Sequence, residues 1–145
     1  MVFERSSTQY VTFEWRYDTD GKVWTQAQAH TTLVAKTPYS IIVNEYGQIA
    51  STLAASGLAS LVGCPYAAAV AADEIWFQIG GYITAMVTAS LSMAVGEAMD
   101  VNTSAVADNG ADYSGAAGEF AVATAATTTS TTQTAMLVPR YVLGT

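Results

Sequence analysis

Cysteine and histidine are nearly absent from this sequence, which contains one of each among 145 residues. The single cysteine, Cys64, excludes an internal disulfide framework, and its place in an apolar run beside Pro65 predicts a buried small side chain rather than a reactive thiolate. Paired carboxylates are also lacking, since Asp73 and Glu74 are neighbours that point to opposite faces of a strand. Acid–base and nucleophilic catalysis have few candidate residues, so we predict that the protein is not an enzyme and has no cofactor or metal.

Positive charge is also scarce. Five residues are basic, none of them between Lys36 and Arg140, and the net charge is −7. Nucleic-acid binding needs a cationic surface, and an acidic body is repelled by anionic membranes, so we predict neither partner. The uncharged stretch from residue 46 to residue 72 is long enough to span a bilayer, but glycine and proline interrupt it and alanine supplies most of its hydrophobicity. We predict that it is not a membrane span.

The chain has few charged residues of either sign to keep the surface of the folded protein solvated. Charged residues make up 12% of the chain and hydrophobic residues 51%. A free monomer with so few charges is an unusual solute, so we expect much of its exterior to be covered by other copies of the chain or by a larger assembly. The sequence therefore predicts a symmetric homo-oligomer.

The stretch around which the chain is organised runs from residue 73 to residue 89. Apolar residues alternate with Trp76 and Gln78 in its first half, and a second alternating run covers residues 82 to 89, as in β-strands. Gly80 and Gly81 between them fit either a tight hairpin turn or a bulge that redirects one long strand. No helix follows, which argues against a phosphate-binding loop. We identify Trp76, Gln78, Gly80 and Gly81 as candidate fold-organising residues.

An aromatic hairpin is predicted near the N-terminus. Residues 8 to 17 alternate between apolar and polar, residues 18 to 21 form a turn, and residues 22 to 25 return as a partner strand. Because Tyr, Trp and Arg carry much of the energy of protein interfaces, this hairpin is a candidate contact with a partner subunit; the alternative is that it packs on its own domain. The candidate interface residues are Phe13, Trp15, Arg16, Tyr17, Lys22 and Trp24.

The rest of the chain also has a β-like pattern. Short strands are predicted near residues 39, 48, 118 and 135, residues 102 to 116 are predicted as a loop, and the threonine tract from residue 127 to 134 as a hairpin loop. Alanine favours helix for residues 52 to 72, but the glycines there and the β-like chain that follows favour strands, which we predict. Asp108, Asp112 and Glu119 are interpreted as solvated carboxylates rather than metal ligands.

These patterns together predict an all-β fold. We expect a small β-sandwich or β-barrel-like body over residues 39 to 145, preceded over residues 1 to 38 by an extended N-terminal arm or hairpin.

Several short motifs suggest a family. They are VGCPYAAA from Val62, DEIWFQIGG from Asp73, VGEAM from Val95, GEFAVA from Gly118 and AMLV from Ala135. This succession, over about residues 39 to 143, resembles the head decoration (capsid cement) proteins of tailed bacteriophages. The resemblance implies a non-enzymatic protein of the virion that binds the outer surface of an icosahedral capsid, commonly as a homotrimer at threefold positions. The N-terminal segment has no counterpart in the resemblance.

Two function classes follow. The first is a capsid decoration protein that stabilises the shell by bridging subunits of the major capsid protein, a mechanism that needs buried interface and no catalytic residue. The second is a binding module of a virion or cell surface, associated with a tail for example, in which exposed tyrosine and tryptophan contact a receptor or a carbohydrate. Most aromatic residues lie in strand patterns rather than in loops, which favours the first class.

Overall fold

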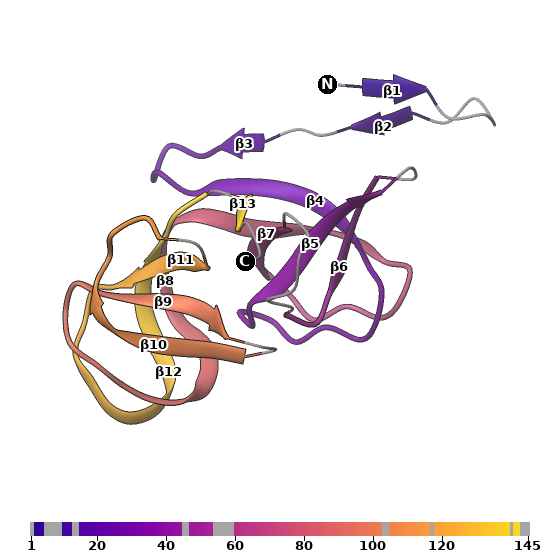
Figure 1. Ribbon diagram of the computed structural model, residues 1–145. Coiled ribbons are helices and arrows are strands. Elements are labelled where there is room, and N and C mark those ends of the chain that lie inside the picture. The colour runs from indigo at the N-terminus through magenta and orange to yellow at the C-terminus, as the bar shows by residue number, and fades with distance from the viewer. Residues whose placement is uncertain are drawn as a thin grey trace.

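The structure of the protein, a computed structural model, describes residues 2–4, 10–12, 15–44, 47–53, 60–102, 105–116, 118–139 and 141–142. Within these residues the chain forms strands and no helix, which confirms the predicted all-β fold class. The strands are β1 (Val2–Glu4), β2 (Tyr10–Thr12), β3 (Trp15–Tyr17), β4 (Val23–Ala29), β5 (Tyr39–Asn44), β6 (Gly47–Ser51), β7 (Ser60–Pro65), β8 (Glu74–Met93), β9 (Glu97–Asn102), β10 (Ala105–Asp112), β11 (Glu119–Ala123), β12 (Thr127–Leu137) and β13 (Tyr141–Val142). All except β1 and β2 belong to one mixed sheet (Figure 1).

Five strands of this sheet close into a ring. β8 pairs with β4 along one edge and with β7 along the other, and the pairings β4–β6, β6–β5 and β5–β7 complete the circle. Phe77 of β8 has a partner on both sides, Thr25 in β4 and Pro65 in β7. The body therefore contains a small closed barrel, and a buried cluster that includes Phe77, Ile79 and Leu61 fills it.

A second lobe is built on the other half of β8. There β8 pairs with β12, and β11, β9 and β10 follow in antiparallel order. β10, the last strand in this order, lies against β8, so the sheet curls around its own core. Figure 1 shows these strands as the orange and yellow lobe beside the barrel. Its interior holds Met86, Met99, Phe120 and Leu137, all buried.

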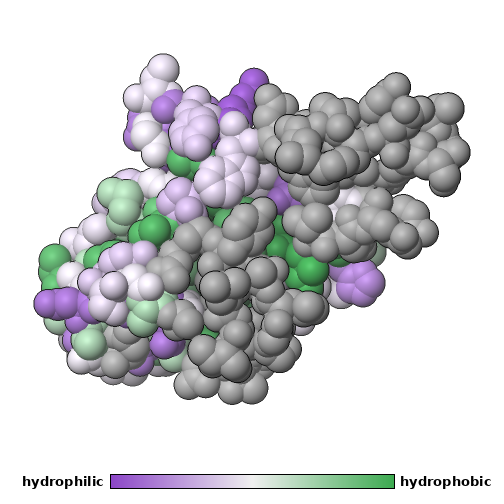
Figure 2. Space-filling model, turned by 45° about the horizontal axis from the view of Figure 1, so that its top comes forward, coloured by the Kyte–Doolittle hydropathy of each residue, from purple (hydrophilic) through white to green (hydrophobic). Residues whose placement is uncertain are grey.

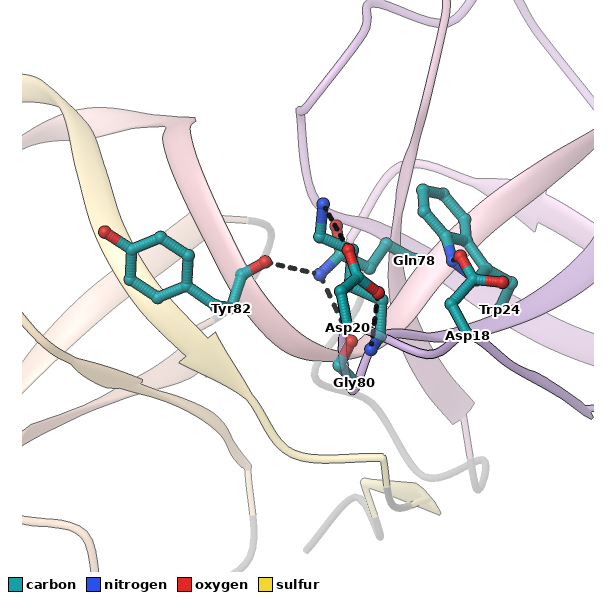
Figure 3. Close-up of polar contacts among 7 residues, drawn as sticks. Asp18, Asp20, Trp24, Gln78, Gly80 and Tyr82 are labelled. Atoms are coloured by element: carbon teal, nitrogen blue, oxygen red, sulfur yellow. Dashed lines mark hydrogen bonds and ion pairs between the residues drawn. The ribbon is translucent and has the colours of Figure 1, made fainter.

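β8 is one continuous strand of 20 residues, so the bulge reading of the glycine pair is correct and the hairpin reading is wrong. Gly81 has φ of +87°, and the register of β8 with β4 shifts opposite this point. The buried amide of Gln78 fixes the bend, because its Nε2 donates to the carbonyl oxygens of Gly80 at 3.1 Å and Tyr82 at 2.9 Å (Figure 3). The bend carries β8 from the barrel into the second lobe.

Two predicted loops are strands in the structure. Residues 105 to 112, which lie in the loop predicted over residues 102 to 116, form β10. The strand has a bulge after Asp108, whose carboxylate accepts a hydrogen bond from the Gly110 N–H at 2.7 Å. The threonine tract forms most of β12, whose register with β8 shifts at three places and whose Thr129 has φ of +49°. Turn-forming residues and β-branched residues occur both in loops and in bulged strands. The local sequence of these two segments therefore did not distinguish a loop from a bulged strand.

The alanine-rich segment is partly strand, as predicted. Residues 60 to 65 form β7, and Cys64 is a buried side chain at 1% exposure, whose burial raises the pKa of its thiol. Residues 66 to 73 are not a strand, apart from one bridge between Leu33 and Ala69. Residues 54 to 59 lie outside the described residues.

The predicted aromatic hairpin is present from Trp15 to Thr25, and its second strand is part of the barrel. The prediction that residues 8 to 17 form one strand of it is wrong for Tyr10–Thr12, which pair with β1. β3 pairs with β4 in the register Trp15 to Thr25 and Tyr17 to Val23, and Gly21 of the intervening turn has φ of +83°. β4 lies between β8 and β6, so this strand, which precedes residue 38, belongs to the same sheet as the strands that follow residue 38. β1 and β2 pair only with each other, and Figure 1 shows them at the top of the view, apart from the barrel strands.

Candidate functional site

Strands β3, β4 and β8 present one group of aromatic and charged side chains on the outside of the barrel. Arg16 in β3 is the register partner of Trp24 in β4, and Trp24 is the partner of Gln78 in β8. Trp76 precedes Gln78 by two residues and so points to the same face. Tyr66, just after β7, is held beside this row because its N–H donates to the carbonyl oxygen of Trp76 at 3.2 Å. The adjacent strands of the barrel thereby bring together residues that are 60 positions apart in sequence.

These side chains surround a shallow recess of about 250 Å³. We call the recess and its lining the aromatic face; its residues are Arg16, Asp18, Trp24, Tyr66 and Trp76. Trp24 and Trp76 are half-buried, whereas Tyr66 is 62% exposed. The indoles are therefore held by the sheet, and the phenol ring is free to adjust.

Two contacts fix the polar groups of the aromatic face. The Trp24 indole Nε1 donates to a carboxylate oxygen of Asp18 at 2.7 Å (Figure 3). The guanidinium carbon of Arg16 lies 5.2 Å from the centre of the Trp76 ring, a cation–π geometry. The lining of the recess thus contains one carboxylate and one guanidinium, each in contact with a tryptophan.

The predicted interface residues divide between the two faces of the β3–β4 hairpin. Arg16 and Trp24 belong to the aromatic face, whereas Trp15 packs against the barrel core and Tyr17 is 70% exposed outside the recess. Lys22 lies in the turn, where its Nζ is 3.4 Å from a carboxylate oxygen of Asp20. Phe13 lies outside the described residues. The hairpin therefore presents two different surfaces rather than a single interface.

Tyr66 and Asp18 were not among the site residues predicted from the sequence, and Trp76 was predicted only as a fold-organising residue. The alternation in β8 did place Trp76 opposite the core residues, which was the available signal. Recognition of the site also required knowing that β4 pairs with β8 and that Tyr66 follows the neighbouring strand, and local patterns do not contain strand pairing.

A second group of polar residues, around Glu119, serves the fold. The Glu119 carboxylate is buried and accepts hydrogen bonds from the N–H groups of Ser114, Gly115 and Ala116 at 3.0, 2.6 and 2.9 Å. Burial alone would raise the pKa of Glu119, but these donors and the Ser114 hydroxyl outweigh it and lower the pKa. The described residues contain no group of three His, Cys, Asp or Glu side chains placed to hold a metal ion.

Asp100 lies directly opposite Glu119 in the pairing of β9 with β11. Burial raises the pKa of Asp100, and repulsion from Glu119 and Asp108 raises it further. A carboxyl whose folded-state pKa exceeds its unfolded value costs stability when it is ionised, and this cost vanishes below the unfolded pKa of about 3.9. Ionised Asp100 therefore opposes the stabilisation that ionised Glu119 provides. The stabilisation by Glu119 is fully present above the pKa of glutamate in the unfolded chain, and it is lost as the pH falls through the lower pKa of Glu119 in the folded state.

We expect Asp100→Asn to raise the free energy of unfolding at pH 7 by up to about 1 kcal/mol, because it removes a like charge directly opposite Glu119. The gain should disappear near pH 3. Urea denaturation at the two pH values measures it. Glu74→Gln is the control, since Glu74 is exposed and pairs with Gln28, yet loses the same unit of charge. If Asp100→Asn and Glu74→Gln raised the free energy of unfolding equally, the cause would be the change in net charge and not the position of Asp100 opposite Glu119.

Comparisons with known proteins do not place this chain in a family. Searches of protein-family models, of curated proteins and of solved structures gave no match. In the part of the chain that the structure describes, no helix is long and apolar enough to cross a membrane.

Proposed function

We propose that this protein is a structural component of a virion, a capsid decoration protein that binds the outer surface of an icosahedral head. It stabilises the shell by bridging subunits of the major capsid protein. The proposal rests on the motif resemblance, and the observation that supports it best is the weakly charged exterior. On the coloured part of the face shown in Figure 2, small groups of strongly hydrophilic residues lie among pale residues of intermediate hydropathy and green hydrophobic patches. Such a surface suits burial in an assembly better than solvation of a monomer.

A capsid decoration protein acts through the surface area that it buries against the shell, and it needs no catalytic residue. Burial of apolar surface contributes about 25 cal/mol per Å², before the cost of association. Each contact can be of ordinary size, because a capsid repeats it many times and a bridging protein holds several subunits at once. A decoration protein therefore needs a stable scaffold and exposed contact residues, and both lobes here have their own buried core.

Self-association is part of the proposal, with a homotrimer as the expected state. Exposed apolar side chains pair on the outer face of the second lobe, where Tyr82 of β8 lies opposite Met136 of β12 and both are more than 40% exposed. This pair is a candidate contact between copies. Native mass spectrometry gives the oligomeric state directly.

The N-terminal ribbon of β1 and β2 is the candidate contact with the shell. Its strands pair with each other and with no other described strand, and a two-stranded ribbon by itself is marginally stable in water. The proposed contact leaves out β3 and β4, which were part of the arm predicted over residues 1–38, because these two strands pair within the main sheet. Contact with the shell would add stability to the ribbon.

We expect removal of residues 1–12 to leave the body folded but to weaken binding to undecorated heads at least tenfold, since about 1.4 kcal/mol of lost contact suffices for that factor. Co-sedimentation with heads measures the binding, and circular dichroism verifies the fold. Undiminished binding would place the shell contact in the β-rich body. A full-length protein that fails to bind any undecorated head would overturn the proposed function itself.

A second candidate function is a binding module that recognises a receptor or a carbohydrate. The observation that favours it is the aromatic face, because recesses lined by aromatic side chains with a few convergent polar groups are typical ligand sites.

A further inference from the structure

We propose that the aromatic face is a sugar-binding site, which takes a pyranose ring against the tryptophans with its hydroxyl groups between Arg16 and Asp18. This inference does not depend on a role in capsids, because it concerns the isolated protein. Its basis is the combination of ring surfaces, hydrogen-bond donors that no described residue accepts from, and a fixed carboxylate within one recess of about 250 Å³.

The aromatic rings supply the apolar half of the site. A pyranose has a face of C–H groups that stacks on an aromatic ring, and such stacking needs ring surfaces that are held in place and partly exposed. Trp24 meets this condition, since it is half-buried and its indole is held by Asp18. Trp76, half-buried on the adjacent paired strand, carries the Arg16 guanidinium on one face of its ring and offers the remaining ring surface. Tyr66, at the margin of the recess, is exposed enough to close over a ring.

The polar groups supply the other half. Within the described part of the chain, no residue accepts a hydrogen bond from the Arg16 guanidinium, the Trp76 indole N–H or the Tyr66 hydroxyl. The Asp18 carboxylate uses one oxygen for Trp24, which leaves the other as an acceptor. The site therefore offers several donors and an oriented acceptor, and sugar hydroxyl groups are both donors and acceptors.

Other ligand classes fit these groups less well. A cationic ligand would be repelled by the Arg16 guanidinium in the lining of the recess, and a phosphate by the Asp18 carboxylate in the same lining. A purely apolar ligand would bury the donors of the recess without supplying acceptors, at a cost that a hydroxylated ring avoids.

The test is titration of the full-length protein with methyl β-glucopyranoside, methyl β-galactopyranoside and chitotriose, followed by tryptophan fluorescence. Two of the three tryptophans line the recess, and Trp15 lies on the opposite face of the hairpin as an internal constant signal. We expect at least one sugar to change the emission, with a dissociation constant in the millimolar range because a small ligand makes few contacts in a shallow recess. No change with any of the three would overturn the proposal.

Two matched variants locate the effect. Tyr66→Ala should weaken the binding of the responding sugar about tenfold, in line with the loss of one stacked ring. Tyr17→Ala removes the same side chain from an equally exposed position outside the recess and should change the affinity less than twofold. Equal effects of the two variants would contradict a site at the aromatic face. Binding of heads is measured separately, so failure of sugar binding leaves the decoration proposal untouched, and the reverse also holds.

Discussion

Replacing Gly81 by alanine should lower the free energy of unfolding by about 2–5 kcal/mol. Alanine at the observed φ of +87° costs about 1–2 kcal/mol. The new Cβ would also lie 2.7 Å from the carbonyl oxygen of Gly21 and 2.9 Å from the Cα of Lys22, and since these are backbone atoms the strands must shift, at about 1–3 kcal/mol. Chemical denaturation followed by circular dichroism measures the loss.

Gly21→Ala separates the two contributions. Gly21 has nearly the same φ, +83°, but a Cβ there meets no atom within 4 Å, so only the conformational cost of about 1–2 kcal/mol applies. Gly110→Ala, with φ of +68° and open space, should behave like Gly21→Ala. Equal losses at Gly81 and Gly21 would mean that the close approach of β8 to the hairpin turn contributes nothing.

Removal of residues 1–36 should abolish the folded body. β4 lies between β8 and β6, and four of its seven side chains, from Val23 to Ala29, are buried. Its loss opens the barrel, exposes Phe77 and Ile79 at about 2–3 kcal/mol each, and leaves the backbone of β8 unpaired along that edge. The sum approaches the whole stability of an ordinary domain, about 5–15 kcal/mol. A thermal melt without a cooperative transition is the expected result.

Removal of residues 1–12 alone is the matched control for this deletion. It takes away only strands that pair with each other, so the melting transition should persist. If the longer deletion instead gave a cooperative transition near that of the intact chain, β4 would be dispensable, and the closed barrel would not be the unit that determines stability.

The sequence predicted those features that depend on local alternation. The two runs on either side of Gly80 and Gly81 have a period of two, which is a property of each strand by itself, and they became β8. The hairpin from Trp15 to Thr25 was likewise predictable, because its turn is encoded by adjacent residues. The choice between hairpin and bulge at the glycine pair was not, since both place φ > 0 on glycine.

Features that depend on pairing between distant strands were not predictable. The neighbours of Trp24 on the outside of the barrel are decided by its register with Gln78, which is more than 50 residues away in sequence. Tyr66 lines the recess because it directly follows β7, another strand of the barrel. The low-complexity threonine tract was predicted as a hairpin loop, but β8 supplies a partner along most of its length. Non-local pairing decides such cases, and a single sequence does not record it.

The order of the strands around the barrel sets the order in which the chain can fold. β4 is made early but needs β6 and β8 as neighbours, and its pairing with β6 is parallel. Until residues 74 to 80 are available, its edge toward β8 has no partner, and the loop that must close is long. The nascent first half of the chain therefore stays open until β8 arrives, and folding is expected to be slow, as in other topologies dominated by distant contacts. During that interval the exposed strand edges are the segments that a chaperone, or a second nascent copy, would meet first.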